Sequence, residues 1–160
     1  MMNEKIKSAL LYICCCLEEY DLLWALTGST NFNIQGINID INDIDVQTDE
    51  NSAYKFEKIF KKHIVKPVVF SSTDKIRSHF GVFEINDVKV EVMGDIQKRL
   101  PNGEWEKKKE LKDIIDFTIF EGYKVPVLNL VYEEKAYRIL GRVEKADMIK
   151  NFLSSREKAE

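Results

Sequence analysis

The chain has 160 residues, a formal net charge of −3 at pH 7 and a hydrophobic content of 44%. This length suits one domain with a substantial core, and a charged content of 32% is typical of a globular rather than a disordered chain. A net negative protein offers no electrostatic footprint for a nucleic-acid backbone, which argues against a polymerase. We therefore expect a single domain over residues 1–160 that uses no nucleic-acid template.

All three cysteines lie in the N-terminal part, at the consecutive positions Cys14 to Cys16. Neighbouring helix residues point about 100° apart, so these thiols cannot converge on a metal, and their clustering is a poor disulfide framework. We expect small buried side chains in a reducing compartment. The sequence also has no secretory signal pattern and no apolar run near the length of a membrane span. These features predict a cytoplasmic protein with no membrane partner.

The predicted elements begin with a helix over residues 3–20, followed by a strand at 22–27 and a short helix at 29–35. The first helix has one apolar stripe, formed by Ile6, Leu10, Ile13 and Leu17. Gly28 permits a tight turn after the strand. A helix that starts directly after a strand directs free backbone N–H groups outward, where they attract anions. Gly28 and Ser29 are therefore candidate phosphate-binding residues, and an ordinary turn capped by Ser29 is the alternative.

Two acids alternate with two apolar residues in Asp43-Ile44-Asp45-Val46. Strand side chains alternate between faces, so Asp43 and Asp45 point the same way while Ile44 and Val46 point the other way. Carboxylates side by side on a strand repel each other, and a divalent cation held by hard oxygen ligands removes that conflict. The pair therefore predicts a metal site, and a solvated strand face is the alternative.

A β-hairpin is predicted further along, with alternating runs at 79–85 and 88–92 around a turn at Asn86-Asp87. Before it, a helix capped by Asp49 or Asn51 and an edge strand beginning at Pro67 are expected. In the second hairpin strand Lys89 and Glu91 share one face. If this strand neighbours the one that carries Asp43 and Asp45, all three acids face one cleft.

The remaining chain is expected to form a polar excursion at 94–113, a second hairpin joining 114–120 to 123–127, and two helices from residue 130 with Gly141 near their joint. In the excursion, Lys98 and Arg99 lie closest in sequence to Glu91. His63 and His79 have no Cys or His partners at metal-ligand spacing and are interpreted as structural. Core positions on the last helices are Leu130, Tyr137, Leu140, Ile149 and Leu153.

The spacing of these motifs resembles the nucleotidyltransferase superfamily, the fold of polymerase-beta-type enzymes and antibiotic adenylyltransferases. That family's pattern is an apolar residue, Gly, Gly or Ser, a spacer, then acid-apolar-acid-apolar, with a third acid on a later strand. Gly28, Ser29, Asp43, Asp45 and Glu91 stand at the matching positions. The resemblance is carried by about residues 22–93. The segments 92–100 and 140–145 further resemble a small stand-alone prokaryotic branch similar to lincosamide and aminoglycoside adenylyltransferases.

The resemblance implies an α/β (α+β) nucleotidyltransferase fold: a small mixed, twisted sheet with helices mainly on one face, a catalytic core at about 22–93, and a C-terminal hairpin and helices at 114–156. It implies transfer of a nucleoside monophosphate, AMP from ATP, to a hydroxyl of a small molecule or a protein, releasing pyrophosphate. Two Mg²⁺ ions, with Mn²⁺ as a substitute, would be held by Asp43, Asp45 and Glu91, and Glu91 could also act as the base.

Three basic residues are candidate nucleotide-binding groups. Arg77 precedes the first hairpin and could approach the triphosphate, with a surface arginine as the alternative. Arg142 and Lys145 lie on the predicted C-terminal helices, where members of the superfamily often place phosphate-contacting residues. The rival to an enzyme is a non-catalytic nucleotide- or partner-binding module on the same fold. The three acids argue against that rival, because a binding module has no need for a destabilising carboxylate cluster.

Overall fold

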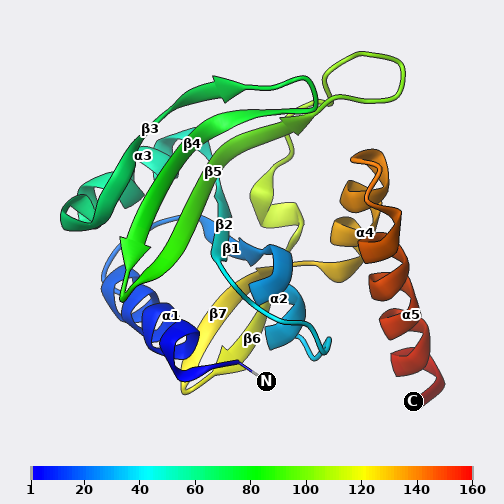
Figure 1. Cartoon of the computed structure of the whole chain (residues 1–160), viewed down its shortest axis with the longest axis horizontal. Coiled ribbons are helices and arrows are strands. Elements are labelled where there is room, and N and C mark those ends of the chain that lie inside the picture. Colours follow the sequence, from blue (N-terminus) through cyan, green and yellow to red (C-terminus); the bar gives the residue numbers. More distant parts are fainter. Residues whose placement is uncertain (1, 160) are drawn as a thin grey trace.

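The computed structural model describes residues 2–159 and shows an α/β fold built on one seven-stranded sheet (Figure 1). The strands are β1 (Trp24–Thr27), β2 (Ile44–Thr48), β3 (Ile64–Ser72), β4 (Ile76–Ile85), β5 (Val88–Lys98), β6 (Ile115–Phe120) and β7 (Tyr123–Leu128). The α-helices are α1 (Glu4–Leu17), α2 (Gly28–Ile34), α3 (Glu50–Ile59), α4 (Leu130–Ile139) and α5 (Val143–Ala159). Short 3₁₀ turns occur at η1 (Lys61–His63) and η2 (Leu111–Asp113).

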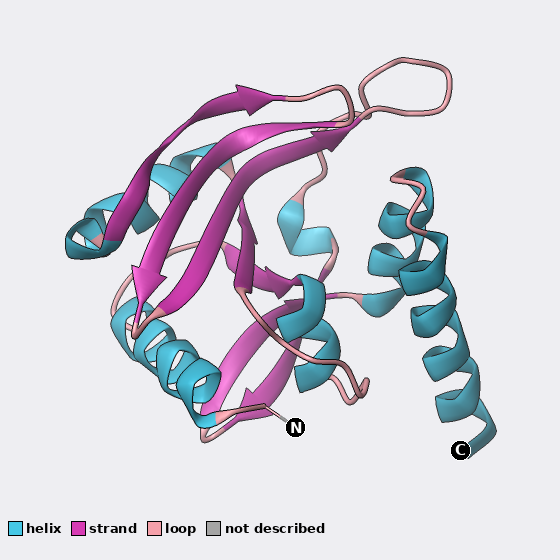
Figure 2. Ribbon diagram, viewed as in Figure 1, coloured by secondary structure: helices cyan, strands magenta, loops and turns pink. Residues whose placement is uncertain are grey.

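The sheet is mixed, and its strands lie in the order β3-β4-β5-β2-β1-β7-β6. β1 runs antiparallel to β2 and parallel to β7, and β2 runs parallel to β5. Figure 2 shows the strands twisting across the molecule, which confirms the predicted mixed, twisted sheet. β3 is an edge strand, as Pro67 predicts, because proline has no N–H to donate to a second neighbour.

Helices α1 and α3 cover one face of the sheet. The stripe of α1 is buried together with Phe56 of α3 and the apolar residues of β2 and β5. Ile44 and Val46, predicted to face away from the acids, are fully buried, and so are Val90 and Val92 of β5. Side-chain caps fix the start of both helices. Asn3 accepts a hydrogen bond from the Ile6 N–H at 2.9 Å, and Asp49 accepts one from the Ser52 N–H at 2.7 Å.

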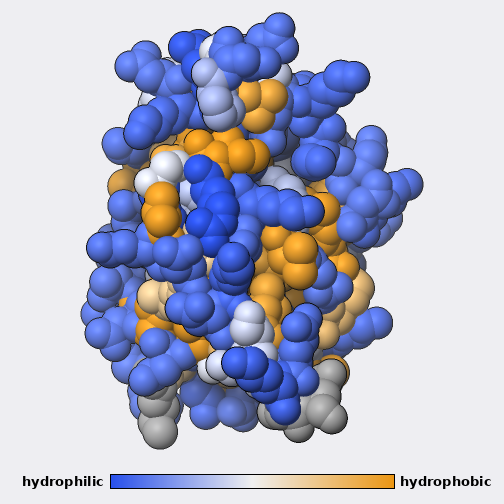
Figure 3. Space-filling model, turned by 90° about the vertical axis from the view of Figure 1, so that its right-hand side faces the viewer, coloured by the Kyte–Doolittle hydropathy of each residue, from blue (hydrophilic) through white to orange (hydrophobic). Residues whose placement is uncertain are grey.

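Helices α4 and α5 lie side by side and run in opposite directions, joined at Gly141, which has φ +77° (Figure 1). They enclose a second core with α2, and its buried residues are Phe32, Ile37, Leu130, Tyr137, Ala146 and Ile149. Two helices joined near Gly141 confirm the predicted C-terminal pair. The side of the molecule at the right of Figure 1 is largely hydrophilic, with apolar patches between the charged residues (Figure 3).

The structure corrects two expectations. β5 continues to Lys98, so residues 94–98 belong to the sheet rather than to a polar excursion. The pairing with β4 shifts between Arg77 and His79, where Asp95 has φ +50°, and this bulge interrupts the alternation that a strand shows in sequence. Of the three cysteines, all free, only Cys14 is buried, and Cys15 is exposed. No helix within residues 2–159 is both long and apolar enough to cross a membrane.

Candidate active site

The turn at Gly28 forms the centre of the site. Gly28 follows β1 with φ +68°, a conformation that other residues rarely adopt. A Cβ at this position would lie 2.5 Å from Oδ2 of Asp45, and real Cβ atoms do not approach so closely. Glycine is therefore required at position 28 for two reasons: the positive φ angle, and the space that the Asp45 carboxylate occupies.

Two neighbouring strands, β2 and β5, bring the acids beside the turn that ends β1. In the register of the sheet, Thr27 of β1 lies opposite Asp45 of β2, and Asp45 lies opposite Glu91 of β5. Asp43 lies one residue before β2, where its backbone carbonyl accepts a hydrogen bond from Thr30 Oγ1 at 2.9 Å. The predicted adjacency of the β2 and β5 acids is confirmed.

The electrostatics of Asp45 show that negative charge accumulates here. Burial, together with the nearby charges of Glu91, Asp43 and Glu133, raises the pKa of Asp45 to about 7, and Lys145 opposes this shift. A carboxylate held in this way is poorly compensated by the protein itself. Such a group is stabilised by a cation or by a proton.

Glu91 has a partner of its own in this structure. Its Oε1 lies 2.8 Å from Nζ of Lys89, on the same face of β5. No group of three or more His, Cys, Asp or Glu side chains in residues 2–159 is arranged closely enough to hold a metal ion. Asp43, Asp45 and Glu91 thus share one region, but Glu91 would have to leave Lys89 to join the other two at a common ion.

A cavity of about 360 Å³ opens beside these acids. Thr27, Gly28, Asp45 and Glu91 form one side of it. Apolar residues of β4, β5 and α4 form much of the rest: Ile76, Phe80, Met93, Ile96, Tyr137 and Leu140. Tyr137, interpreted from the sequence as a core residue, therefore also faces the cavity, as does Phe80. Tyr137 is nevertheless 9% exposed and packs edge-on against Phe32, with ring centroids 5.5 Å apart.

The C-terminal helices bring two of the predicted basic residues to the site. Arg142 lines the cavity, and its guanidinium lies 5.8 Å from the ring centroid of Tyr137. Nζ of Lys145 lies at the same distance from that ring, and its charge acts on Asp45. Both positions place positive charge near the carboxylates.

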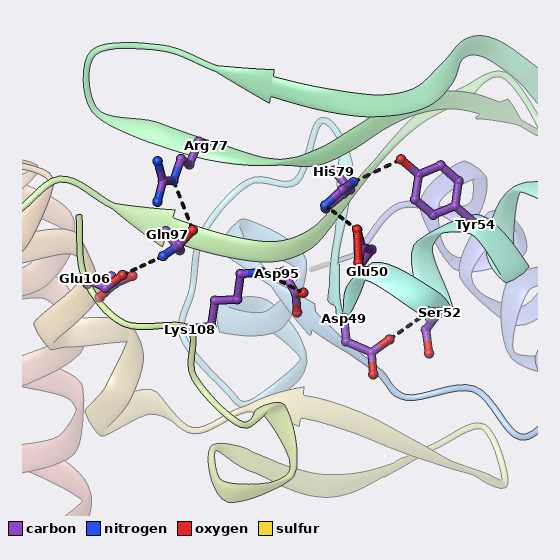
Figure 4. Close-up of polar contacts among 10 residues, drawn as sticks. All are labelled: Asp49, Glu50, Ser52, Tyr54, Arg77, His79, Asp95, Gln97, Glu106 and Lys108. Atoms are coloured by element: carbon purple, nitrogen blue, oxygen red, sulfur yellow. Dashed lines mark hydrogen bonds and ion pairs between the residues drawn. The ribbon is translucent and has the colours of Figure 1, made fainter.

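Arg77 is not brought to the cavity. Its side chain points to the other face of β4, where Nε donates to Oε1 of Gln97 at 3.0 Å (Figure 4). The guanidinium also lies over the ring of Trp105, 4.6 Å from the centroid, and Arg99 lies over the same ring at 4.6 Å. Ser29 is half-buried in the first turn of α2 and is not among the residues that line the cavity.

The two histidines have structural contacts, as the sequence interpretation expected. His79 lies between Oε1 of Glu50 and the hydroxyl of Tyr54, each 3.0 Å from a ring nitrogen (Figure 4). Nε2 of His63 lies 3.2 Å from the Tyr12 hydroxyl.

Two buried charged groups lie at the cavity: Lys98, which the sequence indicated only by its closeness to Glu91, and Glu133, which sequence reasoning missed. Lys98 is 3% exposed and bonds Glu106 Oε1 at 2.8 Å and the Tyr132 hydroxyl at 3.1 Å. Glu133, also 3% exposed, accepts hydrogen bonds from the Gly28 turn. A signal for Glu133 existed, because it lies three residues after Leu130 and four before Tyr137, on the stripe predicted to face the core.

The comparisons with known proteins agree with this architecture. Residues 9–150 match the family model described as aminoglycoside-2''-adenylyltransferase. A candidate nucleotidyltransferase from Thermotoga maritima, solved by crystallography, is 44% identical, with a TM-score of 0.85 over 97% of this chain and 96% of that one. No curated protein shows significant sequence similarity.

More distant structures share the fold. The lincosamide antibiotic adenylyltransferase LnuA, with lincomycin bound, has 14% identity and a TM-score of 0.56 over 92% of this chain and 98% of that one. ANT(2'')-Ia, in complex with adenylyl-2''-tobramycin, has 12% identity and a TM-score of 0.58 over 95% and 91%. The family match covers most of the chain, and the fold and acid pattern agree with it. The chain belongs to the aminoglycoside-2''-adenylyltransferase family and is a nucleotidyltransferase.

Proposed function

We propose that this protein transfers AMP from ATP to a hydroxyl group of a small molecule in a Mg²⁺-dependent reaction that releases pyrophosphate. The observation that carries the proposal is the pairing of Asp45 with Glu91 beside the Gly28 turn, at the wall of a cavity also lined by Arg142. Acids, a glycine turn and a basic residue are the parts that phosphoryl-type transfer uses for charge neutralisation and positioning.

The donor chemistry of the site fits Mg²⁺. Asp43, Asp45 and Glu91 offer only carboxylate oxygens, and the raised pKa of Asp45 shows negative charge that the surrounding protein leaves uncompensated. We assign Asp43 and Asp45 as ligands of two Mg²⁺ ions, which Mn²⁺ could replace, and Glu91 as a ligand once it leaves Lys89. When bound, the ions would supply charge neutralisation at the phosphates and acidify the acceptor hydroxyl.

The protein's own groups then have separate tasks. The Gly28–Ser29 turn and the basic residues Arg142 and Lys145 would bind and orient the triphosphate. Glu91 would accept the proton of the acceptor hydroxyl. The hydroxyl oxygen forms a bond to the α-phosphorus, the bond from that phosphorus to the bridging oxygen breaks, and pyrophosphate leaves with the electron pair.

The cavity favours a small-molecule acceptor. Its volume of about 360 Å³ lies within the range of small-molecule pockets, about 300 to 1,000 Å³, and its wall is largely apolar, as in such pockets. LnuA was solved with lincomycin and ANT(2'')-Ia with adenylyl-2''-tobramycin, which makes a hydroxyl-bearing, antibiotic-like compound the first substrate to test. Three free cysteines fit a reducing, cytoplasmic location, where ATP is available.

The test uses α-labelled ATP, Mg²⁺ and the full chain, with a panel of hydroxyl-bearing small molecules and, separately, the protein fraction of a cell extract. We expect label on a small molecule, release of pyrophosphate, and no transfer by Asp45→Asn. Label found only on a protein would mean that the acceptor is a protein rather than a small molecule. No transfer in any arm, together with no Mg²⁺-dependent nucleotide binding, would overturn the proposed function.

A further inference from the structure

Glu133 is a buried carboxylate whose hydrogen bonds all come from the turn beside Asp45. Its Oε2 accepts from the Gly28 N–H at 3.1 Å, from Asn31 Nδ2 at 3.0 Å and from Thr27 Oγ1 at 2.9 Å. Its Oε1 accepts from the same threonine hydroxyl at 3.0 Å. These donors are more than 100 positions away in sequence, so the contact links α4 to the end of β1 and the start of α2.

Two of the donors that Glu133 holds, Thr27 and Gly28, also lie beside Asp45. Thr27 lies directly opposite Asp45 between β1 and β2, and the missing Cβ of Gly28 leaves the space that Oδ2 of Asp45 occupies. A shift of the turn by a fraction of an ångström would therefore press on that carboxylate or withdraw its support. The position of Asp45 depends on where Thr27 and Gly28 are held.

Stability alone does not require a carboxylate here. Burying an ionised group is costly, and desolvation raises the pKa of Glu133 despite its hydrogen bonds. A neutral amide could accept the same bonds through one oxygen, and an apolar residue would pack against the neighbouring core. What this side chain adds is reach, because it spans from the α4 backbone to three donors of one turn.

We propose that Glu133 is a positioning residue, which holds the Thr27–Gly28 turn at the distance from α4 that sets the Asp45 carboxylate in its working place. None of its hydrogen bonds goes to Asp43, Asp45 or Glu91, so its contacts position Asp45 through Gly28 and Thr27, while its charge also acts on Asp45 across the cavity wall. The kinetic readout of this inference rests on the proposed nucleotidyl transfer. A second readout, amide hydrogen exchange, does not.

Two substitutions at this position separate reach from charge. Glu133→Asp keeps the charge but shortens the side chain by one methylene, so it cannot hold all three donors. Glu133→Gln keeps the length. Its amide oxygen can take the place of Oε2, and its NH₂ can donate to the Thr27 hydroxyl in place of Oε1. Glu134→Gln is the matched control, because Glu134 is the next residue on α4 and pairs with Arg138 at 3.4 Å, away from the turn.

We expect Glu133→Asp to lower kcat at least tenfold per folded molecule, with a change in the nucleotide KM below about threefold. Glu133→Gln should restore kcat to within about threefold of the natural protein, and Glu134→Gln should match it. Amide exchange over residues 27–31 should accelerate at least tenfold in Glu133→Asp, with exchange in α1 unchanged. Measurements well below each variant's melting temperature keep a loss of stability from imitating a loss of kcat.

A Glu133→Asp variant with natural kcat and natural exchange at 27–31 would overturn the inference. So would a Glu133→Gln variant as impaired as Glu133→Asp, since charge rather than reach would then be required. If Glu133→Asp does not fold, Thr27→Val removes only the hydroxyl donor, and unchanged kcat in that variant would also refute the assignment. If the natural protein transfers no nucleotide, the proposed function fails, and the exchange comparison alone still decides whether Glu133 holds the turn.

Discussion

Asp45 and Glu91 lie opposite each other in the parallel pairing of β2 and β5, although 45 residues separate them along the chain. Burial and the charge of Glu91 together bring the pKa of Asp45 to about 7. It is therefore unfavourable for both carboxylates to be ionised at the same time. A fold selected only for stability would avoid this pairing. Their relationship supplies the first two predictions.

Asp45→Asn should leave the metal-free protein as stable as the natural one, or more stable, while abolishing transfer. Asparagine keeps the shape of the side chain and removes the repulsion, but it binds Mg²⁺ poorly. Melting temperature of the metal-free protein, measured beside nucleotide transfer, checks both halves. A clear loss of stability with activity retained would mean that Asp45 holds the fold together rather than doing chemistry.

The same carboxyl should make the metal-free protein less stable as pH rises from about 4 to about 7. Its folded-state pKa of about 7 lies above the ordinary value of 3.8, so the folded state binds the proton more tightly. Stability from this group is therefore full below pH 4 and is lost as pH rises through 7, by a few kcal/mol. Denaturant unfolding at several pH values gives the free energy of unfolding as a function of pH. Its decrease between about pH 4 and pH 7 should be smaller in Asp45→Asn than in the natural protein. Identical decreases in the two proteins would contradict the raised pKa.

Gly28→Ala should destabilise the protein and abolish transfer, because the new Cβ would collide with Oδ2 of Asp45. Gly122→Ala is the matched control, since Gly122 has φ +84° and nothing within 4 Å of an added Cβ. Both variants should lose about 1–2 kcal/mol of unfolding free energy to the left-handed backbone. Only Gly28→Ala should lose activity, and equal activity in the two would show that the close approach to Asp45 is not needed.

ATP should stabilise the protein strongly only when Mg²⁺ or Mn²⁺ is present. A ligand at a hundred times its dissociation constant adds about 2.7 kcal/mol, which corresponds to roughly 5–10 °C in melting temperature for a chain of this size. Thermal melting with ATP, with and without the metal, makes the comparison. Mg²⁺ alone and EDTA with ATP are the controls. Equal shifts with and without metal would remove the assignment of Asp43 and Asp45 as metal ligands.

The core of the site could be predicted from sequence because it depends on local alternation. The acid-apolar-acid-apolar pattern determines that Asp45 and Ile44 lie on different faces of the sheet. By the same alternation, the side chain of Glu91 lies on the other face from those of Val90 and Val92. Once β2 and β5 pair, the adjacency of Asp45 and Glu91 follows. The turn at Gly28 and the C-terminal helix pair are local features as well.

What could not be predicted depends on contacts between segments far apart in the chain. Glu133 accepts a hydrogen bond from the Gly28 N–H. Lys98 is buried in contact with Glu106 and the Tyr132 hydroxyl. Arg77 was a candidate for the triphosphate, but its side chain bonds Gln97 and stacks on Trp105 and does not line the cavity, as those of Ile76 and Ser78 do. Spacing along α4 indicates that Glu133 faces the core, but it does not indicate which distant residues Glu133 contacts there.

The stacking of Arg77 and Arg99 on Trp105 gives the molecule a natural fluorescent reporter. The protein has two tryptophans, and Trp24 is 8% exposed in the strand β1, where its emission should stay constant. Trp105 lies against two guanidinium groups, in the segment that also supplies Glu106 to Lys98 at the cavity. A change in its emission when a substrate is added would therefore show that the surroundings of this segment change, without any attached label.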